Sequence, residues 1–529
     1  MQDPATPPSP SKMPTFGRFF RWLFSWRNIR RTLVCCAALA TLIALFYAEE
    51  NWRGKHAWEK YRKEAESKGG ILDWQSFIPP KVPDDQNFAM TPFLAPLFDF
   101  NPEPRSEGQS RWRDTNGYNR ATQFVHELNE TKLISDRSLI NLEEAAVRLQ
   151  SPSNAPAISF SNRMEAATEV LRILKNYEPE LDEIKTASHR PFARFNVSYN
   201  DENPAGILLP HLSVLKRLSL IFALRASAEL ALGKANEAFD DVQMVFYLAE
   251  SINNEPFVIS QLVRVAIIKN FAKQIIWEGL AGHQWNEEQI QGLQSSLRKL
   301  ALIKDLDRSL HAEREGFGDR LFQYIRNHLS DIPSWFDGGG DAGLCRAFYW
   351  LPKGWLYQEQ VVYYKLFGEG YFKGIDPVAG RVEPRVIEQR KQEIERQFQG
   401  SSFSFMWKHR LLSKVLLPSF GGLIEKCAHA QTDAELADLA CALERYRIAN
   451  GTLPDSLSAL APQFIPAVPH DVINGELMIY QRLDHGRFKL YSVGWNEKDD
   501  GGTEVMAKGK TRQIDPKQGD WVWPQYPVQ

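Results

Sequence analysis

Residues 434–450 read AELADLACALERYRIAN, and residues 451–454 continue as GTLP. Apolar side chains recur every three or four positions in the first stretch, which is the spacing of one face of an α-helix. They are Leu436, Leu439, Leu443, Tyr446 and Ala449. Gly451 supplies the left-handed residue that ends such a helix, and Pro454 follows where a helix cannot continue. The stretch therefore predicts an amphipathic helix with a defined end.

Two short segments after this helix favour β-structure. Residues 477–480 read LMIY and residues 488–493 read FKLYSV, and both are rich in β-branched and aromatic side chains. Asp484-His485-Gly486 lies between them and is typical of a tight turn. The order predicts a helix packed on a small antiparallel sheet.

This order of elements resembles the globular part of bacterial type II secretion pseudopilins. The resemblance covers residues 428–520, from the helix to the stretch in which Tyr491-Ser492-Val493-Gly494 is followed by Asp499-Asp500-Gly501-Gly502. It implies a small α+β module for binding or assembly outside the cytoplasm. The chain departs from the family by placing residues 49–425 between its apolar N-terminal run and this module. In addition, no apolar run begins with the family's processed Phe followed by a Glu at its fifth place.

The loop after the last predicted strand is acidic. In the family, a loop of this kind often holds a calcium ion, and hard oxygen donors suit that ion. The matching residues here are Asn496, Asp499, Asp500 and Glu504. The resemblance therefore implies a calcium site, and an ordinary solvated turn is the alternative, because Asp-Asp-Gly-Gly is also common turn chemistry.

The N-terminal region contains an uncharged apolar run, Thr32–Ala48, which spans about 25 Å as a helix. Basic residues precede it at Arg18, Arg21, Arg27, Arg30 and Arg31. This bias predicts a single bacterial inner-membrane span with a cytoplasmic N-terminus and an extracytoplasmic remainder. Basic residues also follow the span, at Arg53, Lys55, Lys60, Arg62 and Lys63. A cleaved signal peptide is the alternative, but Phe46 stands where a small residue would precede the cut.

Composition limits the function classes. The chain has 63 basic and 65 acidic residues, so no global positive field favours nucleic-acid binding. Hydrophobic residues make up 43% of the chain, which predicts folded domains rather than disorder. Five cysteines are too few for a disulfide framework. Three of them lie outside the apolar run, namely Cys345, Cys427 and Cys441, and their disulfide state stays open.

The segment after the span predicts a stalk and a strap. Trp52–Lys68 is a charged helix, and residues 78–89 hold several prolines that favour an extended strap over a domain surface. The strap segment and the C-terminal module together resemble poorly characterised bacterial membrane-anchored proteins. That resemblance carries no assigned activity.

The centre of the chain predicts packed helices. One apolar stripe runs from Val214 to Ala231, Gly233 ends it, and a second stripe runs to Ile252, which predicts a helical hairpin. Residues 257–280 are apolar on nearly every side and predict a buried central helix. Asn286 with Gln289 three positions later predicts a capping box.

The best candidate for chemistry lies in the next helix. Leu306, Leu310, Phe317 and Leu321 define an apolar stripe, yet Glu313 and Arg314 occupy positions between them, with His311 and Glu315 nearby. Glu313 is either an acid with a shifted pKa or half of a buried ion pair with Arg314 or another cation. No HExxH, GxSxG, P-loop or CxxC motif accompanies it.

The sequence thus predicts a mainly α protein with five parts. They are a basic tail (1–31), a membrane anchor (32–48), a stalk and strap (49–110), a helical extracytoplasmic domain (111–425) and a pseudopilin-like α+β domain (426–529). The leading hypothesis is a non-enzymatic interaction protein that binds an envelope partner, associated with a secretion or pilus-like system. The alternatives are a membrane-tethered hydrolase with Glu313 as its acid and a small-ligand-binding protein framed by aromatic residues. That aromatic segment contains Trp335, Gly338–Gly340, Tyr349, Trp350 and Trp355.

Overall fold

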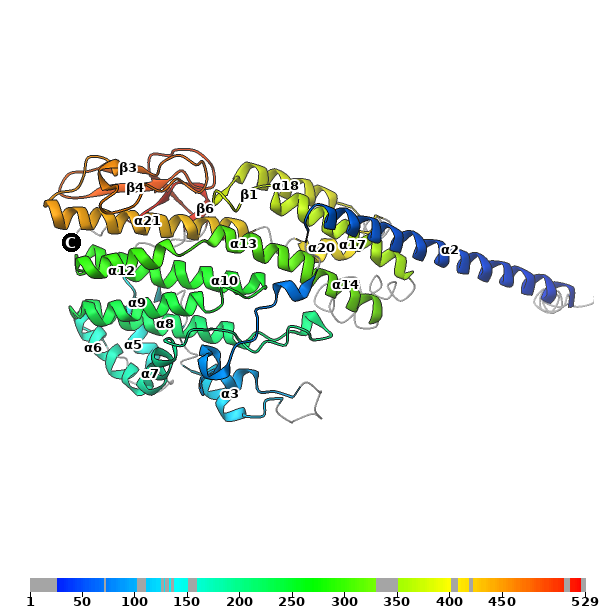
Figure 1. Cartoon of the computed structure of the whole chain (residues 1–529), viewed down its shortest axis with the longest axis horizontal. Helices are drawn as coiled ribbons and strands as arrows, with labels where there is room; N and C mark the ends of the chain where they lie inside the picture. The colour runs from blue at the N-terminus through cyan, green and yellow to red at the C-terminus, as the bar shows by residue number, and fades with distance from the viewer. Residues whose placement is uncertain are drawn as a thin grey trace, which may run out of the picture.

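The computed structural model confirms a mainly helical protein with small antiparallel sheets near the C-terminus (Figure 1). It describes residues 26–70, 73–101, 111–124, 128, 133–134, 138–150, 159–329, 351–400, 408–417, 422–508 and 514–524. The helices form a body several layers deep, and one long helix extends away from it (Figure 1).

That long helix is α2 (Trp26–Ser67), which runs unbroken for 42 residues through both the predicted span and the predicted stalk. Its N-terminal part contains a window long and apolar enough to cross a membrane, with a mean hydropathy of 1.9 and none of it buried. Such a helix is compatible with a membrane anchor or a signal sequence. The other described helix that passes the same test, Pro204–Ala231, is 61% buried and belongs to the core of the body.

The second half of α2 packs against α17 (Lys353–Phe367) at a crossing of two glycines. A Cβ added at Gly54 would lie 1.9 Å from the carbonyl oxygen of Gly354, so only glycine allows this approach. The Gly354 N–H donates to Asn51 Oδ1 at 2.7 Å, and Gln358 Nε2 donates to Glu50 Oε1 at 2.6 Å. Backbone proximity and these two hydrogen bonds fix α2 to the body.

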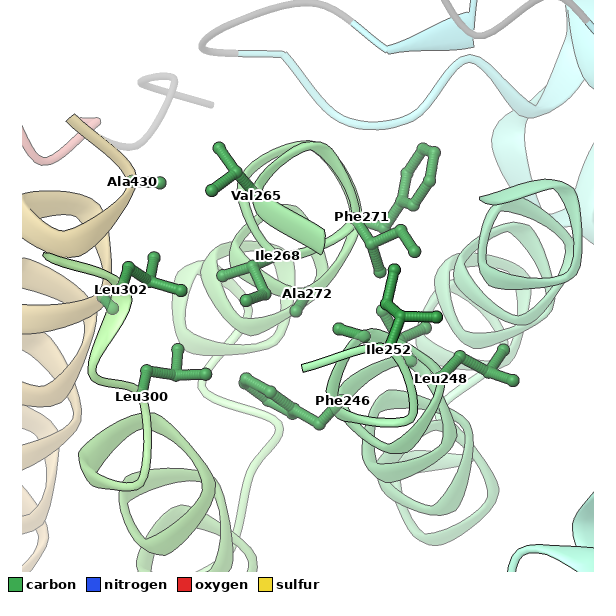
Figure 2. Packing of buried hydrophobic residues seen from close by; sticks show 14 of the residues in the cluster. Phe246, Leu248, Ile252, Val265, Ile268, Phe271, Ala272, Leu300, Leu302 and Ala430 are labelled. Carbon is green, nitrogen blue, oxygen red and sulfur yellow. The ribbon is translucent and has the colours of Figure 1, made fainter. Parts of the chain in front are cut away.

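The helical body is built from elements that the sequence largely predicts. The predicted hairpin is confirmed as α8 (Pro210–Ala231) and α9 (Ala235–Glu250), and Gly233 between them has φ +72°. Residues 257–280 form the buried centre, as α10 (Val258–Ile267), a π-helical turn η7 (Ile268–Ala272) and α11 (Lys273–Ala281). Figure 2 shows Val265, Ile268, Phe271 and Ala272 packed between α9 and Ala430.

The remaining elements surround this centre. The capping box at Asn286 and Gln289 is confirmed at the start of α12 (Glu287–Arg298). The other principal helices are α3 (Thr115–Thr122), α5 (Leu142–Leu149), α6 (Arg163–Leu174), α7 (Glu178–Ala187), α13 (Leu302–His311), α14 (Gly318–Asn327), α18 (Pro384–Gln397) and α20 (Leu411–Leu416). The strap is held on the body by Asn87, whose side chain donates to the Arg194 carbonyl at 2.7 Å.

Helix α21 (Leu423–Asn450) joins the body to the C-terminal sheets. It ends as predicted, with Gly451 at φ +73°, but it begins at Leu423 rather than at Ala434. The earlier turns were not recognised because they are buried against helices on several sides, which removes the simple apolar stripe. Cys427 and Cys441 both lie buried on this helix as free thiols, while Cys345 lies outside the described residues.

The predicted hairpin is confirmed as two antiparallel strands, β3 (Ile479–Arg482) and β4 (Phe488–Ser492), with Tyr480 opposite Leu490. A third strand, β7 (Trp521–Val522), completes a sheet with the order β3-β4-β7. A separate pair consists of β5 (Glu504–Met506) and β6 (Ile514–Gly519), and a small pair, β1 (Ile375–Asp376) with β2 (Arg381–Val382), lies beside the module.

We predict that Gly54→Ala destabilises the full chain by about 1–3 kcal/mol, because the new methyl group forces α2 and α17 apart. The loss should outweigh the intrinsic gain in helix propensity, which is about 1 kcal/mol. Unfolding in detergent, followed by circular dichroism, measures the change. The control is Gly422→Ala, where a Cβ meets nothing within 4 Å. Equal midpoints for both variants would show that the crossing is not tightly packed.

Candidate functional site

Glu313 lies in a π-helical turn, η8 (Ala312–Phe317), between α13 and α14. A π-turn inserts one residue into a helix and therefore redirects the side chains that follow, and such turns are frequent at functional sites. The partly buried Glu313 side chain lines a cavity of about 310 Å³. The other lining residues are Pro204, Ala205, Ile207, Leu209, Phe257, Val258, Ile259, Leu262 and Phe317.

The environment of Glu313 favours its protonated form. Burial raises the pKa of its carboxyl group to about 7, and a hydrogen bond from the Val258 N–H acts in the opposite direction. Val258 is the first residue of α10, whose N-cap residue offers no side-chain hydrogen bond. The Glu313 carboxyl group therefore accepts a hydrogen bond from an N–H group at the start of α10, although Glu313 belongs to a segment far away in the sequence.

The predicted pairing of Glu313 with Arg314 is wrong. The Arg314 guanidinium pairs with Glu315 and lies over the Phe372 ring at 4.6 Å. His311 Nδ1 lies 3.1 Å from the same Glu315 carboxylate. The π-turn explains why Glu313 and Arg314 contact different residues from those expected, because the expectation was based on a regular α-helical period through these residues. Glu313 makes no ion pair within the described part of the chain.

The cavity around Glu313 is lined mainly by apolar side chains. Glu313 is the one ionisable side chain among the described residues that line it, and the others are apolar. A hydrolase acid needs a water-activating or nucleophilic partner within hydrogen-bond reach. The hydrolase alternative stays a prediction.

The acidic loop is organised around a buried residue that the sequence pattern did not indicate. Asp520 Oδ2 accepts from the Gly502 N–H at 2.7 Å and from the Thr503 N–H at 3.2 Å, while Oδ1 accepts from the Asp500 N–H at 3.2 Å. Gly501 and Gly502 have φ values of +70° and +72°, which allow these N–H groups to converge. A protein carboxylate therefore lies at the centre of the turn.

The four predicted calcium ligands are divided among different contacts. Asn496 Nδ2 donates to Asp500 Oδ2 at 2.7 Å, and the Tyr491 hydroxyl donates to Asp499 Oδ1 at 3.0 Å. Glu504 lines a different cavity, beside α21. Among the described residues, no group of three or more His, Cys, Asp or Glu side chains could hold a metal ion. The calcium site stays a prediction.

A buried polar network between the body and α21 was not predicted. Lys269 Nζ lies 2.9 Å from His429 Nδ1, and Lys273 Nζ lies 2.5 Å from Asp433 Oδ1. A lysine ammonium only donates, so Nδ1 accepts and the neutral ring carries its proton on Nε2. The His429 ring stacks on Trp521 with a centroid distance of 4.5 Å.

Burial and the nearby Lys269 hold the pKa of His429 well below its usual range. Burial alone would raise the pKa of Asp433, but Lys273 and its neighbours hold it below the ordinary value. The network borders a cavity of about 250 Å³. The sequence contains one feature that could have indicated this network. Two lysines lie four residues apart in a mainly apolar segment, and His429 and Asp433 have the same spacing in α21.

Several predicted features lie outside the described residues. They are Arg18, Arg21, Trp335, Gly338–Gly340, Tyr349 and Trp350. Trp355 is described, and it is a buried residue of α17 whose ring packs against His409 at 5.3 Å. Comparisons of the chain with models of protein families, with curated proteins and with solved structures find no match.

We predict that Glu313→Gln removes a pH-dependent loss of stability. The folded pKa of about 7 exceeds the ordinary 4.5, so the folded state binds the proton more tightly. The contribution of protonated Glu313 to the free energy of unfolding is therefore complete below pH 4.5. It decreases as the pH rises to about 7 and does not change further at higher pH. At pH 8 the variant should be more stable than the wild type by at most about 3 kcal/mol.

Unfolding midpoints of the full chain in detergent between pH 4 and pH 8 measure the effect. Glu237→Gln, at an exposed position of α9, is the control and should keep the wild-type profile. A Glu313→Gln variant that loses stability at every pH would contradict the assignment of a neutral acid.

We predict that Asp520→Asn destabilises the chain by about 1–3 kcal/mol, because several backbone N–H groups lose a charged acceptor. Thermal unfolding in the presence of a chelator isolates this effect from metal binding. The calcium hypothesis predicts a separate gain of about 2.7 kcal/mol at a hundredfold excess of calcium over Kd. That gain should vanish in Asp499→Asn with Asp500→Asn, and equal melting in calcium and in chelator would refute the calcium site.

Proposed function

We propose that the chain is a membrane-anchored interaction protein of the bacterial envelope, which binds a protein partner through its C-terminal module. The observation that carries this proposal is α2, whose apolar N-terminal half is exposed while its C-terminal half is fixed to the body at Gly54. An exposed apolar helix of this length requires a lipid environment or removal. The packed junction between α2 and α17 favours a retained anchor. Cleavage after the apolar run would cut α2 directly before the residues that contact α17.

The basic residues before the span favour a cytoplasmic N-terminus and an extracytoplasmic body. The proposal includes the interpretation of the C-terminal module as pseudopilin-like. Support comes from α21 packed on an antiparallel sheet and ended by Gly451, followed by β3 and β4. The long helical body between anchor and module favours a role beside a secretion or pilus-like assembly rather than as a polymerising subunit.

The surface proposed for partner binding consists of the outer strands of the module. β3 lies at one end of the three-stranded sheet, and β5 pairs with β6 alone among the described strands. Exposed apolar residues accompany these edges, with exposed fractions of 52% at Leu477, 42% at Val505 and 43% at Met506. Unpaired strand edges bind an extended segment of another chain through backbone hydrogen bonds.

Site-specific crosslinking in native membranes tests this proposal. A photoreactive amino acid at Met506 should crosslink to a distinct envelope protein, because this side chain lies at an open strand edge. The control is Met164 of α6, which is 58% exposed. Helix α6 lies across the body from the strands β3 and β4 (Figure 1). Crosslinks of equal yield and identity from both positions would contradict a specific binding surface.

A further inference from the structure

A large polar cavity lies where the stalk meets the body. Its volume is about 550 Å³, within the range of small-molecule sites. Four elements form its walls, namely α2, the short helix η1 (Trp74–Phe77), α14 and α17. The lining residues are Lys55, Trp58, Glu59, Arg62, Asp73, Trp74, Gln75, Asp319, Arg320, Gln323, Arg326 and Tyr357.

Arg326 is the buried cation of this cavity, with an exposed fraction of 7%. Its Nη1 donates to Gln360 Oε1 at 2.6 Å, and its guanidinium lies over the Tyr357 ring at 4.1 Å. Gln360 in turn donates from Nε2 to Asp319 Oδ1 at 2.7 Å, so the amide separates the two charges. No carboxylate among the described residues lies within ion-pair distance of Arg326.

Arg264, the other fully buried arginine among the described residues, has carboxylate partners, whereas the partly buried Arg217 and Arg320 donate only to backbone carbonyls. Arg264 pairs with Glu250 and Asp305, each at 2.7 Å, and Arg225 pairs with Asp241 at 2.5 Å. A buried charge normally requires such a partner. Burial lowers the pKa of Arg326, which agrees with an incompletely compensated charge. An anion that enters the cavity would supply the missing partner.

The rest of the cavity suits an organic molecule larger than a simple ion. Lys55 and Arg62 lie at its rim with side chains 66% and 57% exposed, and each is paired along α2 with a glutamate, Glu59 at 3.9 Å and Glu66 at 2.8 Å. Exposed pairs of this kind are weak, so both cations remain available to an anion. The rings of Trp58 and Trp74 are buried walls, and Trp74 Nε1 donates to the Tyr199 carbonyl at 2.9 Å. Arg320 also lines the cavity, with its guanidinium over the Trp74 ring at 5.6 Å. Glu59, Asp73, Gln75 and Gln323 supply acceptors and amide groups for hydroxyls.

We propose that this cavity binds a phosphate ester that carries hydroxyl groups, with the phosphate on the Arg326 guanidinium and the hydroxyl-bearing part against Trp58 and Trp74. An arginine fork matches phosphate geometry, and aromatic walls with carboxylate and amide neighbours match a polyhydroxyl group. The ligand is either a soluble sugar or glycerol phosphate or the headgroup of a phospholipid. Lys55 lies about 10 Å along α2 beyond Ala48, so a headgroup is within reach.

The test uses the full chain in nanodiscs of phosphatidylcholine. Titration with glycerol phosphate should change the tryptophan fluorescence, because Trp58 and Trp74 line the cavity. Arg326→Gln should weaken this binding about tenfold to a hundredfold, through loss of a charge-assisted hydrogen bond. The control is Arg172→Gln, on α6 with a side chain 64% exposed, which should leave binding unchanged.

A second arm distinguishes the two sources of phosphate. Nanodiscs that contain phosphatidylglycerol should suppress the response to glycerol phosphate if the headgroup occupies the cavity, and should leave it unchanged if the ligand is soluble. Lys55→Gln with Arg62→Gln provides an independent test, because both side chains are exposed and their loss spares the fold. This double variant should weaken binding and reduce its dependence on salt.

Three results would overturn the proposal. The first is binding that neither Arg326→Gln nor the rim double variant changes. The second is no response to glycerol phosphate in phosphatidylcholine nanodiscs together with no preference for phosphatidylglycerol. The third is an equal response in Arg172→Gln and Arg326→Gln. Circular dichroism of each variant accompanies the titrations. If Arg326→Gln does not fold, Arg326→Lys and the rim double variant decide the outcome.

Discussion

Burial of α21 is the constraint on which the rest of the structure depends. This helix contacts α10, α11, α12 and α13 of the body and also β4 and β7 of the module, so both parts share its side chains as core. Two of its acidic residues inside that core are matched by cations from the body, with Arg298 Nε 2.8 Å from Asp438 Oδ2 and Lys273 close to Asp433. A buried carboxylate keeps its charge when such a partner is present, and without one its pKa rises, as at Glu435 of the same helix. The body and the module therefore stabilise each other through a single helix.

Local signals predicted those parts of the fold that local chemistry controls. Gly233 and Gly451 end helices because a left-handed residue is required there, and Asn286 with Gln289 begins one because two side chains satisfy two N–H groups. The π-turns, by contrast, depend on tertiary packing and leave no change of period in the sequence. For that reason the sequence left two alternatives open for Glu313, and of these the ion pair with Arg314 is absent.

The candidate sites were less predictable, because each is assembled from distant segments. Asp520 organises the acidic turn from the far side of β6, and the partner of His429 lies in another helix. Arg326 appeared in the sequence as one more basic residue on an amphipathic helix. Its lack of a carboxylate becomes visible only when α2, α14 and α17 are placed around it. Composition and periodicity carry no information on such convergence.

The unbroken course of α2 would make the proposed anchor rigid along its whole length. At 42 residues the helix is about 63 Å long, and it has no hinge between its apolar half and the glycine crossing with α17. A helix that tilts in the bilayer would carry the whole body with it, and a rotation about its own axis would turn the strand edges of the module toward or away from neighbouring membrane proteins. Bilayer thickness would then set the height and orientation of the proposed binding surface.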